Sequence, residues 1–481
     1  MLLYSAPFLL FFTAVLLVTR LVPTKWKNGC LLLASCLFYA SWGLSSLPIL
    51  LGVTVAAYFG ALLWETKKST PVYVGSLLLL LGCLCVFKYT RFVVNSLNAL
   101  LPSPIQGPSL LQPVGISFFT FQAVGYVIDV HRGKYPAERN FGRVALFVAF
   151  FPQLLSGPIG RGDAMLAQYA CPEKPTWDGL RRGSARMLWG FFLKLVIADR
   201  AAILVNQVYS AYESFPGVCT IFATLVYGLE IYCDFAGYSH MAIGAAEILG
   251  IRLPENFRQP YFAQSIQEFW RRWHISLSTW FRDYLYIPLG GSRKGKWKTW
   301  RNVLLVFLVS GLWHGAGWNF LLWGALHGFY QAFGAWTKPA RQRALNRLGV
   351  RTDTGSFRCL RMLITFLLVD FAWLFFRAES VSQAFGMLRH TVTALNPLYL
   401  VGENWYSMGL NRPNFQLLLV SAAVLLIVDC LEYRGKSVSR WFFRQGALFR
   451  GICWAAAILA ILLFGVWGSA YDAASFIYFQ F

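Results

Sequence analysis

The chain has 481 residues, of which 57% are hydrophobic, 17% are aromatic and only 13% are charged. A soluble domain usually carries about 25% charged residues, so this composition excludes a water-soluble particle of this size. The net charge of +22 would suggest nucleic-acid binding in a soluble protein, but the basic residues stand between apolar runs, as in the cytoplasmic loops of membrane proteins. We therefore expect contacts with membrane lipids and none with nucleic acid.

Apolar stretches recur along the whole chain, and each membrane crossing needs about 20 apolar residues. In the first half we expect helices over residues 2–22, 30–42, 47–63, 72–87, 114–130, 187–205 and 218–249. In the second half we expect them over residues 303–313, 318–336, 359–376, 417–431 and 452–467. The pattern predicts an all-α, polytopic membrane protein with about eleven or twelve spans and no soluble domain.

The apolar stretch over residues 145–160 is interrupted by Pro152 and Pro158. Broken backbone at membrane depth is tolerated only where it faces protein or water, so we expect a re-entrant or kinked element here. Basic loops lie near residues 20–27, 67–68, 131–143, 271–301, 338–358 and 434–450. Placing these loops in the cytoplasm puts both termini outside the cell. The first apolar segment lacks a small-residue cleavage site and is expected to be a retained helix.

The ten cysteines mostly lie inside apolar spans. No CxxC pair exists, and no spacing of cysteine and histidine matches a zinc site. Buried free thiols that pack as small hydrophobic groups are the expected state, and we expect neither a metal ion nor a bound cofactor.

The block over residues 268–288, EFWRRWHISLSTWFRDYLYIP, is polar, basic and aromatic. On a single helix its large apolar side chains share one face at three- and four-residue spacing, while its arginines fall on the other. Such a helix lies at the cytoplasmic boundary or dips into it, with aromatic rings in lipid or protein and arginines in water. His274 falls at the border of the apolar face. That face consists of Phe269, Trp270, Trp273, Leu277, Trp280, Phe281 and Tyr284.

The string SGLWHGAGWN, from Ser310 to Asn319, continues an apolar run that begins at Val303. His314 lies about eleven residues into this run, or about 17 Å along a helix, which is near mid-membrane. An ionisable group at that depth indicates a functional site, and a core histidine that only packs helices is the alternative. A second histidine in a Trp-rich context favours the functional interpretation, in which Trp313 and Trp318 wall the site.

These residues resemble a known family. The strings RRWHISLSTWFRDYLYIPLGGSR and GLWHGAGWNFLLWGALHG strongly resemble the membrane-bound O-acyltransferase (MBOAT) family, above all its bacterial alginate O-acetyltransferase branch. PVGISFFTFQ, DFAGYSHMAIG, ENFRQPY and the C-terminal FIYFQF resemble the same branch. The resemblance covers nearly the whole chain. It implies one integral-membrane domain over residues 1–481, with a catalytic core over residues 113–336 and a helical bundle around a central tunnel.

The family also implies roles for the two histidines. Its later histidine, here His314, is regarded as catalytic, and an earlier Asn, Asp or His position falls on His274. An acyl thioester, acetyl-CoA in this branch, enters from the cytoplasm of a bacterium as the donor. The acetyl group leaves across the inner membrane toward an exported polysaccharide, with the help of an extracytoplasmic acetyltransferase partner. The aromatic C-terminal tail, Phe476 to Phe481, is a candidate docking element for that partner.

Residue chemistry supports acyl transfer independently of the resemblance. An alcohol that attacks a thioester must lose a proton, and neutral imidazole accepts one near pH 7. We expect His314 to be this base and His274 to stabilise the oxyanion or to orient His314. Arginines near the cytoplasmic mouth are candidates for binding donor phosphates, with lipid headgroup contact as the alternative. Further candidate substrate or tunnel residues are Trp313, Trp318, Trp270, Trp273, Ser310, Asn319, His240, Arg271, Arg272 and Arg282.

Three other functions stay open at this point. Within the family, the D-alanyl transfer protein of teichoic acid synthesis takes its acyl group from a carrier protein. A transporter of polysaccharide or lipid-linked sugar would use the histidines to relay protons, but repeat-paired broken helices are missing. A scaffold for the secreted partner would need neither histidine. The chain has no GxSxG elbow, P-loop or HExxH motif, and no pattern specifies which polysaccharide is modified.

Overall fold

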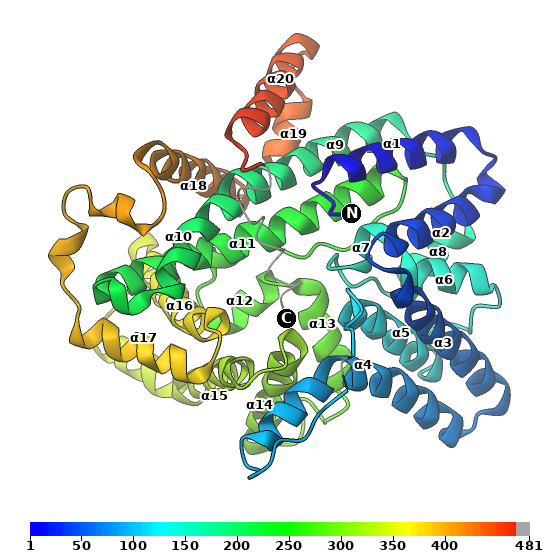
Figure 1. Ribbon diagram of the computed structural model, residues 1–481, viewed down its shortest axis with the longest axis horizontal. Coiled ribbons are helices and arrows are strands. Elements are labelled where there is room, and N and C mark those ends of the chain that lie inside the picture. Colours follow the sequence, from blue (N-terminus) through cyan, green and yellow to red (C-terminus); the bar gives the residue numbers. More distant parts are fainter. Residues whose placement is uncertain (109, 468–481) are drawn as a thin grey trace. The chain divides into compact units, whose positions relative to one another are not determined.

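The computed structural model describes residues 1–108 and 110–467, which contain helices and no strand (Figure 1). The chain divides into two compact units. Unit 1 comprises Met1–Gly190 and Tyr238–Glu255, and unit 2 comprises Phe191–Gly237 and Asn256–Phe481. The C-terminal tail expected to dock a partner, Phe476 to Phe481, lies outside the described residues.

Unit 1 is built from nine helices and the last part of a tenth that both units share. The helices are α1 (Ala6–Leu21), α2 (Thr24–Ala40), α3 (Leu47–Lys67), α4 (Thr70–Asn98), α5 (Ile116–His131), α6 (Phe141–Ala149), α7 (Phe151–Leu154), α8 (Gly162–Ala170) and α9 (Trp177–Phe191). The shared helix is α11 (Gly217–Ile248). Glycines let α9 cross the end of α11, because a Cβ on Gly183 would lie 2.5 Å from the carbonyl oxygen of Gly244.

The proline-interrupted stretch of unit 1 is broken, as expected. Helix α6 ends at Ala149, and α7 is a single turn with Pro152 in its first positions. Every residue from 144 to 160 is buried. Side chains satisfy polar groups at the break: Ser35 Oγ accepts from the Phe151 amide at 3.1 Å, and Gln153 Nε2 donates to the Phe147 carbonyl at 2.9 Å. The irregular backbone therefore faces protein, which is where broken helices are tolerated.

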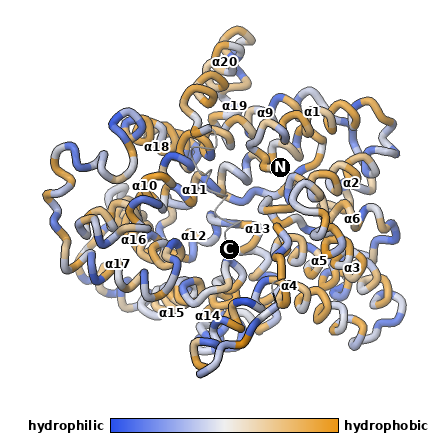
Figure 2. Tube along the Cα trace, viewed as in Figure 1, coloured by the Kyte–Doolittle hydropathy of each residue, from blue (hydrophilic) through white to orange (hydrophobic). Residues whose placement is uncertain are grey.

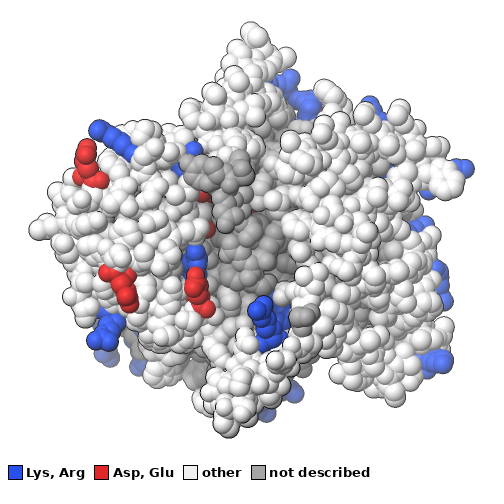
Figure 3. Space-filling view, viewed as in Figure 1, with Lys and Arg blue, Asp and Glu red and all other residues white. Residues whose placement is uncertain are grey.

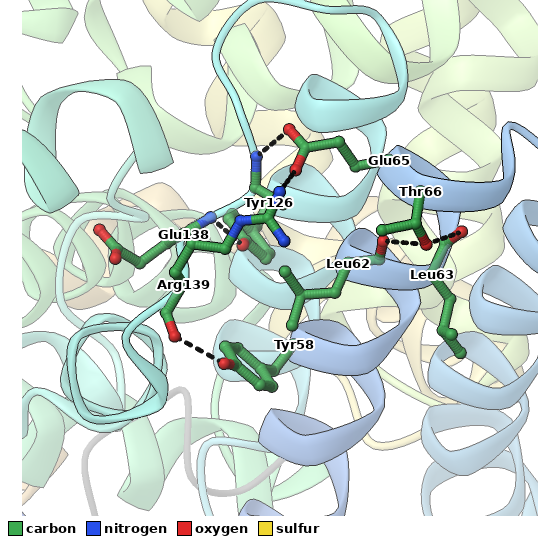
Figure 4. Close-up of polar contacts among 9 residues, drawn as sticks. Tyr58, Leu62, Leu63, Glu65, Thr66, Tyr126, Glu138 and Arg139 are labelled. Carbon is green, nitrogen blue, oxygen red and sulfur yellow. Dashed lines mark hydrogen bonds and ion pairs between the residues drawn. The ribbon is translucent and has the colours of Figure 1, made fainter.

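An acidic residue at the end of α3 anchors the basic loop that follows α5 (Figure 4). Glu65 forms an ion pair with Arg139 at 2.5 Å and accepts a hydrogen bond from the Ala137 amide at 2.9 Å. Tyr58, two turns earlier on α3, donates to the Arg139 carbonyl at 2.7 Å. These contacts hold the loop that follows α5 against α3, so the basic side chains of the loop extend from a backbone that is fixed in place.

Unit 2 contains the helices that carry both histidines of interest. Its longer elements are α10 (Asp199–Ser210), the first part of α11, α14 (Lys296–His314), α15 (Trp318–Arg347), α16 (Gly355–Arg377), α17 (Val381–Thr393), α18 (Arg412–Tyr433) and α20 (Ala447–Phe464), and a short π-helix (Phe192–Ala198) precedes α10. Its short helices are α12 (Ile266–Arg272), α13 (Ile275–Phe281) and α19 (Val438–Phe443), and a π-helical turn (Arg282–Tyr286) follows α13.

Helices α14 and α15 form an antiparallel pair whose backbones nearly touch. A Cβ added to Gly311 would lie 2.3 Å from the Phe320 carbonyl oxygen, and one added to Gly324 would lie 2.3 Å from the Phe307 carbonyl oxygen. Small residues at such crossings are how membrane helices gain close packing. Because His314 is the last residue of α14, this crossing also determines the position of the His314 backbone, from which the imidazole extends.

Six helices within the described residues are long and apolar enough to cross a membrane. They cover Leu44–Lys67, Thr70–Asn98, Gly217–Ile248, Gly355–Arg377, Arg412–Tyr433 and Ala447–Phe464, and α1 is a shorter apolar helix. Figure 2 shows hydrophobic residues running along α3 and α20. The face drawn in Figure 3 carries few acidic side chains, and its Lys and Arg side chains are scattered. The expected all-α, multi-pass membrane protein is confirmed, whereas the count of eleven or twelve spans stays a prediction.

Candidate active site

The block over residues 268–288 does not form one helix, and the prediction of a single helix there is wrong. Helix α12 ends at Arg272, Trp273 is extended, and His274 adopts a left-handed conformation with φ +42° before α13 begins at Ile275. Few residues other than glycine take this conformation. The break turns His274 from the border of an amphipathic face into the protein interior, where its side chain is 0% exposed.

The two faces of this block separate as the spacing predicted. The seven large apolar side chains predicted to share one face are buried inside the protein, whereas Ile287 near the end of the block is 54% exposed. Arg271 and Arg282 are exposed, and Arg272 is half-buried. These apolar residues therefore form the packed side on which His274 sits. They are Phe269, Trp270, Trp273, Leu277, Trp280, Phe281 and Tyr284.

His314 ends α14 and is followed by a short glycine-rich link to α15. A Cβ on Gly315 would lie 2.1 Å from the ring of Phe320, so glycine is needed here for space. The link turns the chain back immediately, and the His314 side chain is 2% exposed. His314 therefore lies in the protein interior, and its depth in the membrane stays a prediction.

The two histidine rings lie close together. Their centroids are 6.1 Å apart with an interplanar angle of 57°. The ring of Trp313 contacts both, with centroid distances of 5.7 Å to His274 and 5.0 Å to His314. The two imidazoles are therefore close neighbours in the interior of unit 2.

Aromatic rings surround the pair. Phe235 from α11 meets His274 edge to face at 4.6 Å. Trp323 from α15 and Phe376 from α16 meet His314 at 5.0 Å and 5.4 Å. Burial lowers the pKa of the His274 imidazole well below its usual value, so the ring is neutral at pH 7. A neutral ring offers one donor and one acceptor nitrogen, which suits proton transfer or oxyanion stabilisation.

The other predicted site residues in unit 2 are spread over several positions. Trp313 is buried against both histidines, whereas Trp318 begins α15 with 61% of its surface exposed and does not enclose the pair. Trp273 is buried and stacks on Phe269 at 5.4 Å. Ser310 and Asn319 are both buried, and Asn319 Nδ2 donates to the Ala378 carbonyl at 2.8 Å. Asn319 thus ties the start of α15 to the end of α16.

The predicted arginines are partly engaged with neighbouring acids. Arg272 pairs with Glu268 at 2.9 Å and lies over the ring of Tyr433. Arg282 pairs with Asp283 at 2.7 Å. Arg271 is exposed. The binding of donor phosphates by these arginines stays a prediction.

His240 belongs to unit 1, and its contacts there are polar. Its Nδ1 accepts from Arg186 Nε at 3.2 Å, and Arg186 in turn forms an ion pair with Glu255. This arrangement links α9 to the end of α11 and the loop after it. A role for His240 in a tunnel stays a prediction.

Several residues of this site are not evident from sequence spacing. Trp270 donates its indole N–H to His327 Nδ1 at 3.3 Å, and the Trp323 ring lies 5.0 Å from both His327 and His314. Trp323 and Asn256 stand in strings that carry the family resemblance, but the spacing of the sequence does not place either of them at the site. The several tryptophans close to His314 in the sequence are the feature that could have indicated Trp323 as a site residue.

A buried ion cluster lies on the π-helix of unit 2. Lys194 Nζ is 2.8 Å from Asp199 Oδ1 and 2.6 Å from Asp234 Oδ1, and Lys194 and Asp234 are each 2% exposed. Asp234 directly precedes Phe235, the ring that contacts His274. Asp234 therefore has a cationic partner, and the pair ties the π-helix to α11 beside the site.

Comparison with known proteins identifies the family to which this sequence belongs. The model of the membrane-bound O-acyltransferase family matches residues 139–368. The chain is 40% identical over 410 residues to a Pseudomonas putida protein named "Probable alginate O-acetylase AlgI", covering 83% of this chain and 80% of that protein. The chain belongs to the MBOAT family. As a member it is a membrane-bound O-acyltransferase, and both histidines discussed here lie inside the matched region.

Two further relatives of this MBOAT protein differ in their printed functions. A peptidoglycan O-acetyltransferase of Helicobacter pylori is 35% identical over 432 residues, covering 83% of this chain and 79% of the relative. A teichoic acid D-alanyltransferase of Bacillus subtilis is 30% identical over 298 residues, covering 58% of this chain and 72% of the relative. The similarity extends further along the chain for the O-acetyl-transferring relatives than for the D-alanyl-transferring one.

Proposed function

We propose that this protein takes an acetyl group from acetyl-CoA in the cytoplasm and passes it across a bacterial inner membrane for O-acetylation of an exported polysaccharide. The observation that carries the proposal is the pair His274 and His314, buried with ring centroids 6.1 Å apart. The longer similarity to O-acetyl-transferring relatives supports acetyl as the group transferred.

In the proposed reaction His314 is the general base. Its neutral imidazole removes the proton of the acceptor hydroxyl while that oxygen attacks the thioester carbonyl carbon. His274 donates a hydrogen bond to the oxyanion that develops, a contribution of about 3 kcal/mol in comparable sites. When the carbon–sulfur bond breaks, the proton held by His314 passes to the departing thiolate. The products are an O-acetyl ester and a free thiol.

The aromatic surroundings support this chemistry physically. Trp313, Trp323 and Phe376 surround the histidines with apolar surface, which keeps water from the thioester and strengthens hydrogen bonds to developing charge. The acceptor is a hydroxyl of a sugar or of an extracytoplasmic acetyltransferase partner. The basic loops favour a cytoplasmic donor side and termini outside the cell.

Donor preference tests the proposal. Purified protein in lipid vesicles is given either radiolabelled acetyl-CoA or a D-alanyl carrier-protein thioester, with a polysaccharide acceptor and the secreted partner. We expect free thiol and labelled polymer to appear with acetyl-CoA only. Turnover of the carrier thioester alone would assign the D-alanyl branch instead, and turnover of neither, with sugar movement intact, would favour the transporter.

A further inference from the structure

The backbone at His274 is held in an uncommon conformation. With φ +42° and ψ 54° it is one of four residues other than glycine with positive φ in the described part of the chain. Such conformations cost energy and persist only where surrounding contacts enforce them, and they cluster at active sites. The contacts that enforce this one therefore also determine where the imidazole points.

His274 occupies the N-cap position of α13 but forms no capping hydrogen bond with its side chain. At an N-cap, Ser, Thr, Asp or Asn usually accepts from the first free amides of the helix. A histidine whose ring is turned toward His314 and Trp313 cannot do so. The first amides of α13 need an acceptor from elsewhere in the chain.

Asn256 supplies these acceptors from a segment nearly twenty residues earlier. Its backbone carbonyl accepts from the Ile275 amide at 2.9 Å. Its side-chain Oδ1 accepts from the Ser276 amide at 3.3 Å and from the Ser276 hydroxyl at 2.9 Å. Asn256 is 1% exposed, so these hydrogen bonds form away from water.

The residues that follow Asn256 contact the end of α12 and the aromatic rings beside His274. The Arg258 amide donates to the Arg272 carbonyl at 2.9 Å, so the segment after Asn256 runs along the end of α12. The ring of Phe257 packs edge to face on Trp273 and on Phe235, each at 5.0 Å. Phe235 in turn contacts the His274 ring. Both the backbone and one side of the ring of His274 are therefore supported from this segment.

We infer that Asn256 is a positioning residue for the acyl-transfer site: it caps α13 in place of His274 and so frees the imidazole to face His314. This inference rests on the proposed function, in which His274 acts on the reacting group. Asn256 acts through His274 and does not touch the substrate. Loss of its side-chain acceptor misplaces the imidazole.

The test measures kcat and KM for acetyl transfer, normalised to folded protein. We expect Asn256→Ala to lower kcat about 10- to 100-fold, because small misplacements of catalytic groups have effects of this size, with KM for the thioester within about twofold. Asn256→Asp, which keeps the acceptor oxygens, is expected to retain most of the activity. In a His274→Ala background, Asn256→Ala is expected to lower kcat no further, because the effects of substituting residues that act as a unit are not additive.

Asn302→Ala is the matched control. Asn302 is also buried in unit 2, and its Nδ2 donates to the carbonyls of Leu289 and Gly291 at 3.1 Å each. We expect this variant to lose stability without the loss of kcat. If Asn256→Ala does not fold, Ser276→Ala, which removes one of the hydrogen bonds, must show a smaller loss of kcat that disappears in the His274→Ala background.

The outcomes separate this inference from the proposed function. Full activity of His274→Ala would overturn the role proposed for that histidine. Inactive His274→Ala together with fully active Asn256→Ala would overturn the positioning role alone. An equal loss of kcat from Asn256→Ala with and without His274 would show that Asn256 acts by another route, and would also overturn the inference.

Discussion

Replacing His314 with alanine is expected to reduce acetyl transfer about 10²- to 10⁴-fold, because general-base catalysis contributes rate factors of that size. His314 is buried beside His274, and alanine removes the imidazole that accepts the proton of the attacking hydroxyl in the proposed reaction. The measurement is the initial rate of labelled polymer formation from acetyl-CoA, with the amount of folded protein determined by size-exclusion chromatography.

His131→Ala is the control for this experiment. His131 ends α5 in unit 1, where its ring stacks on Tyr73 at a centroid distance of 3.7 Å. We expect this variant to transfer acetyl at the wild-type rate. If membranes with His314→Ala acetylate the polymer as well as wild type, the histidine is a packing residue and the proposed mechanism is wrong.

Replacing Lys194 with methionine is expected to destabilise the protein by about 3–5 kcal/mol, the usual cost of removing one partner of a buried ion pair. Lys194 is the buried cation between the carboxylate of Asp234, which is buried, and that of Asp199, which is 10% exposed. Methionine has a similar length, so the change removes charge with little change in volume. The measurement is the temperature at which half of the detergent-solubilised protein remains monodisperse.

Two variants sharpen this experiment. Arg139→Met removes a surface ion pair with Glu65, in which the arginine side chain is 68% exposed, and such pairs contribute about 0–1 kcal/mol. Adding Asp234→Asn to Lys194→Met neutralises one of the carboxylates and is expected to recover part of the lost stability. A transition temperature for Lys194→Met equal to that of Arg139→Met would show that the buried cluster contributes little.

Hydropathy and periodicity predicted most of the fold, because apolar runs and their faces are local properties of the sequence. The helix expected over residues 218–249 is α11, Gly217–Ile248, and that expected over residues 47–63 is α3, Leu47–Lys67. The same method missed the break at His274. A period of 3.6 residues continues smoothly through that block, and only a partner distant in sequence, Asn256, stabilises the left-handed turn.

The site was predictable in its two histidines but not in their supports. Depth in an apolar run indicated His314, aromatic context indicated both histidines, and the family resemblance implied their roles. Hydropathy did not indicate Lys194, because a single cation inside an apolar run hardly alters the mean hydropathy of that run. Trp318 was expected at the site because it follows His314 closely, yet the turn between α14 and α15 leaves it exposed. Each miss depends on tertiary contacts that spacing does not encode.

The proposed mechanism requires His274 and His314 to act on the same thioester. This requirement can be tested with an electron cryo-microscopy structure of the wild-type protein bound to a non-hydrolysable ketone analogue of acetyl-CoA. We expect the carbonyl group of the analogue to lie between the two imidazoles, with its oxygen within hydrogen-bonding distance of a nitrogen of His274. An analogue that inhibits turnover but binds with its carbonyl remote from both rings would show that the proposed mechanism is wrong.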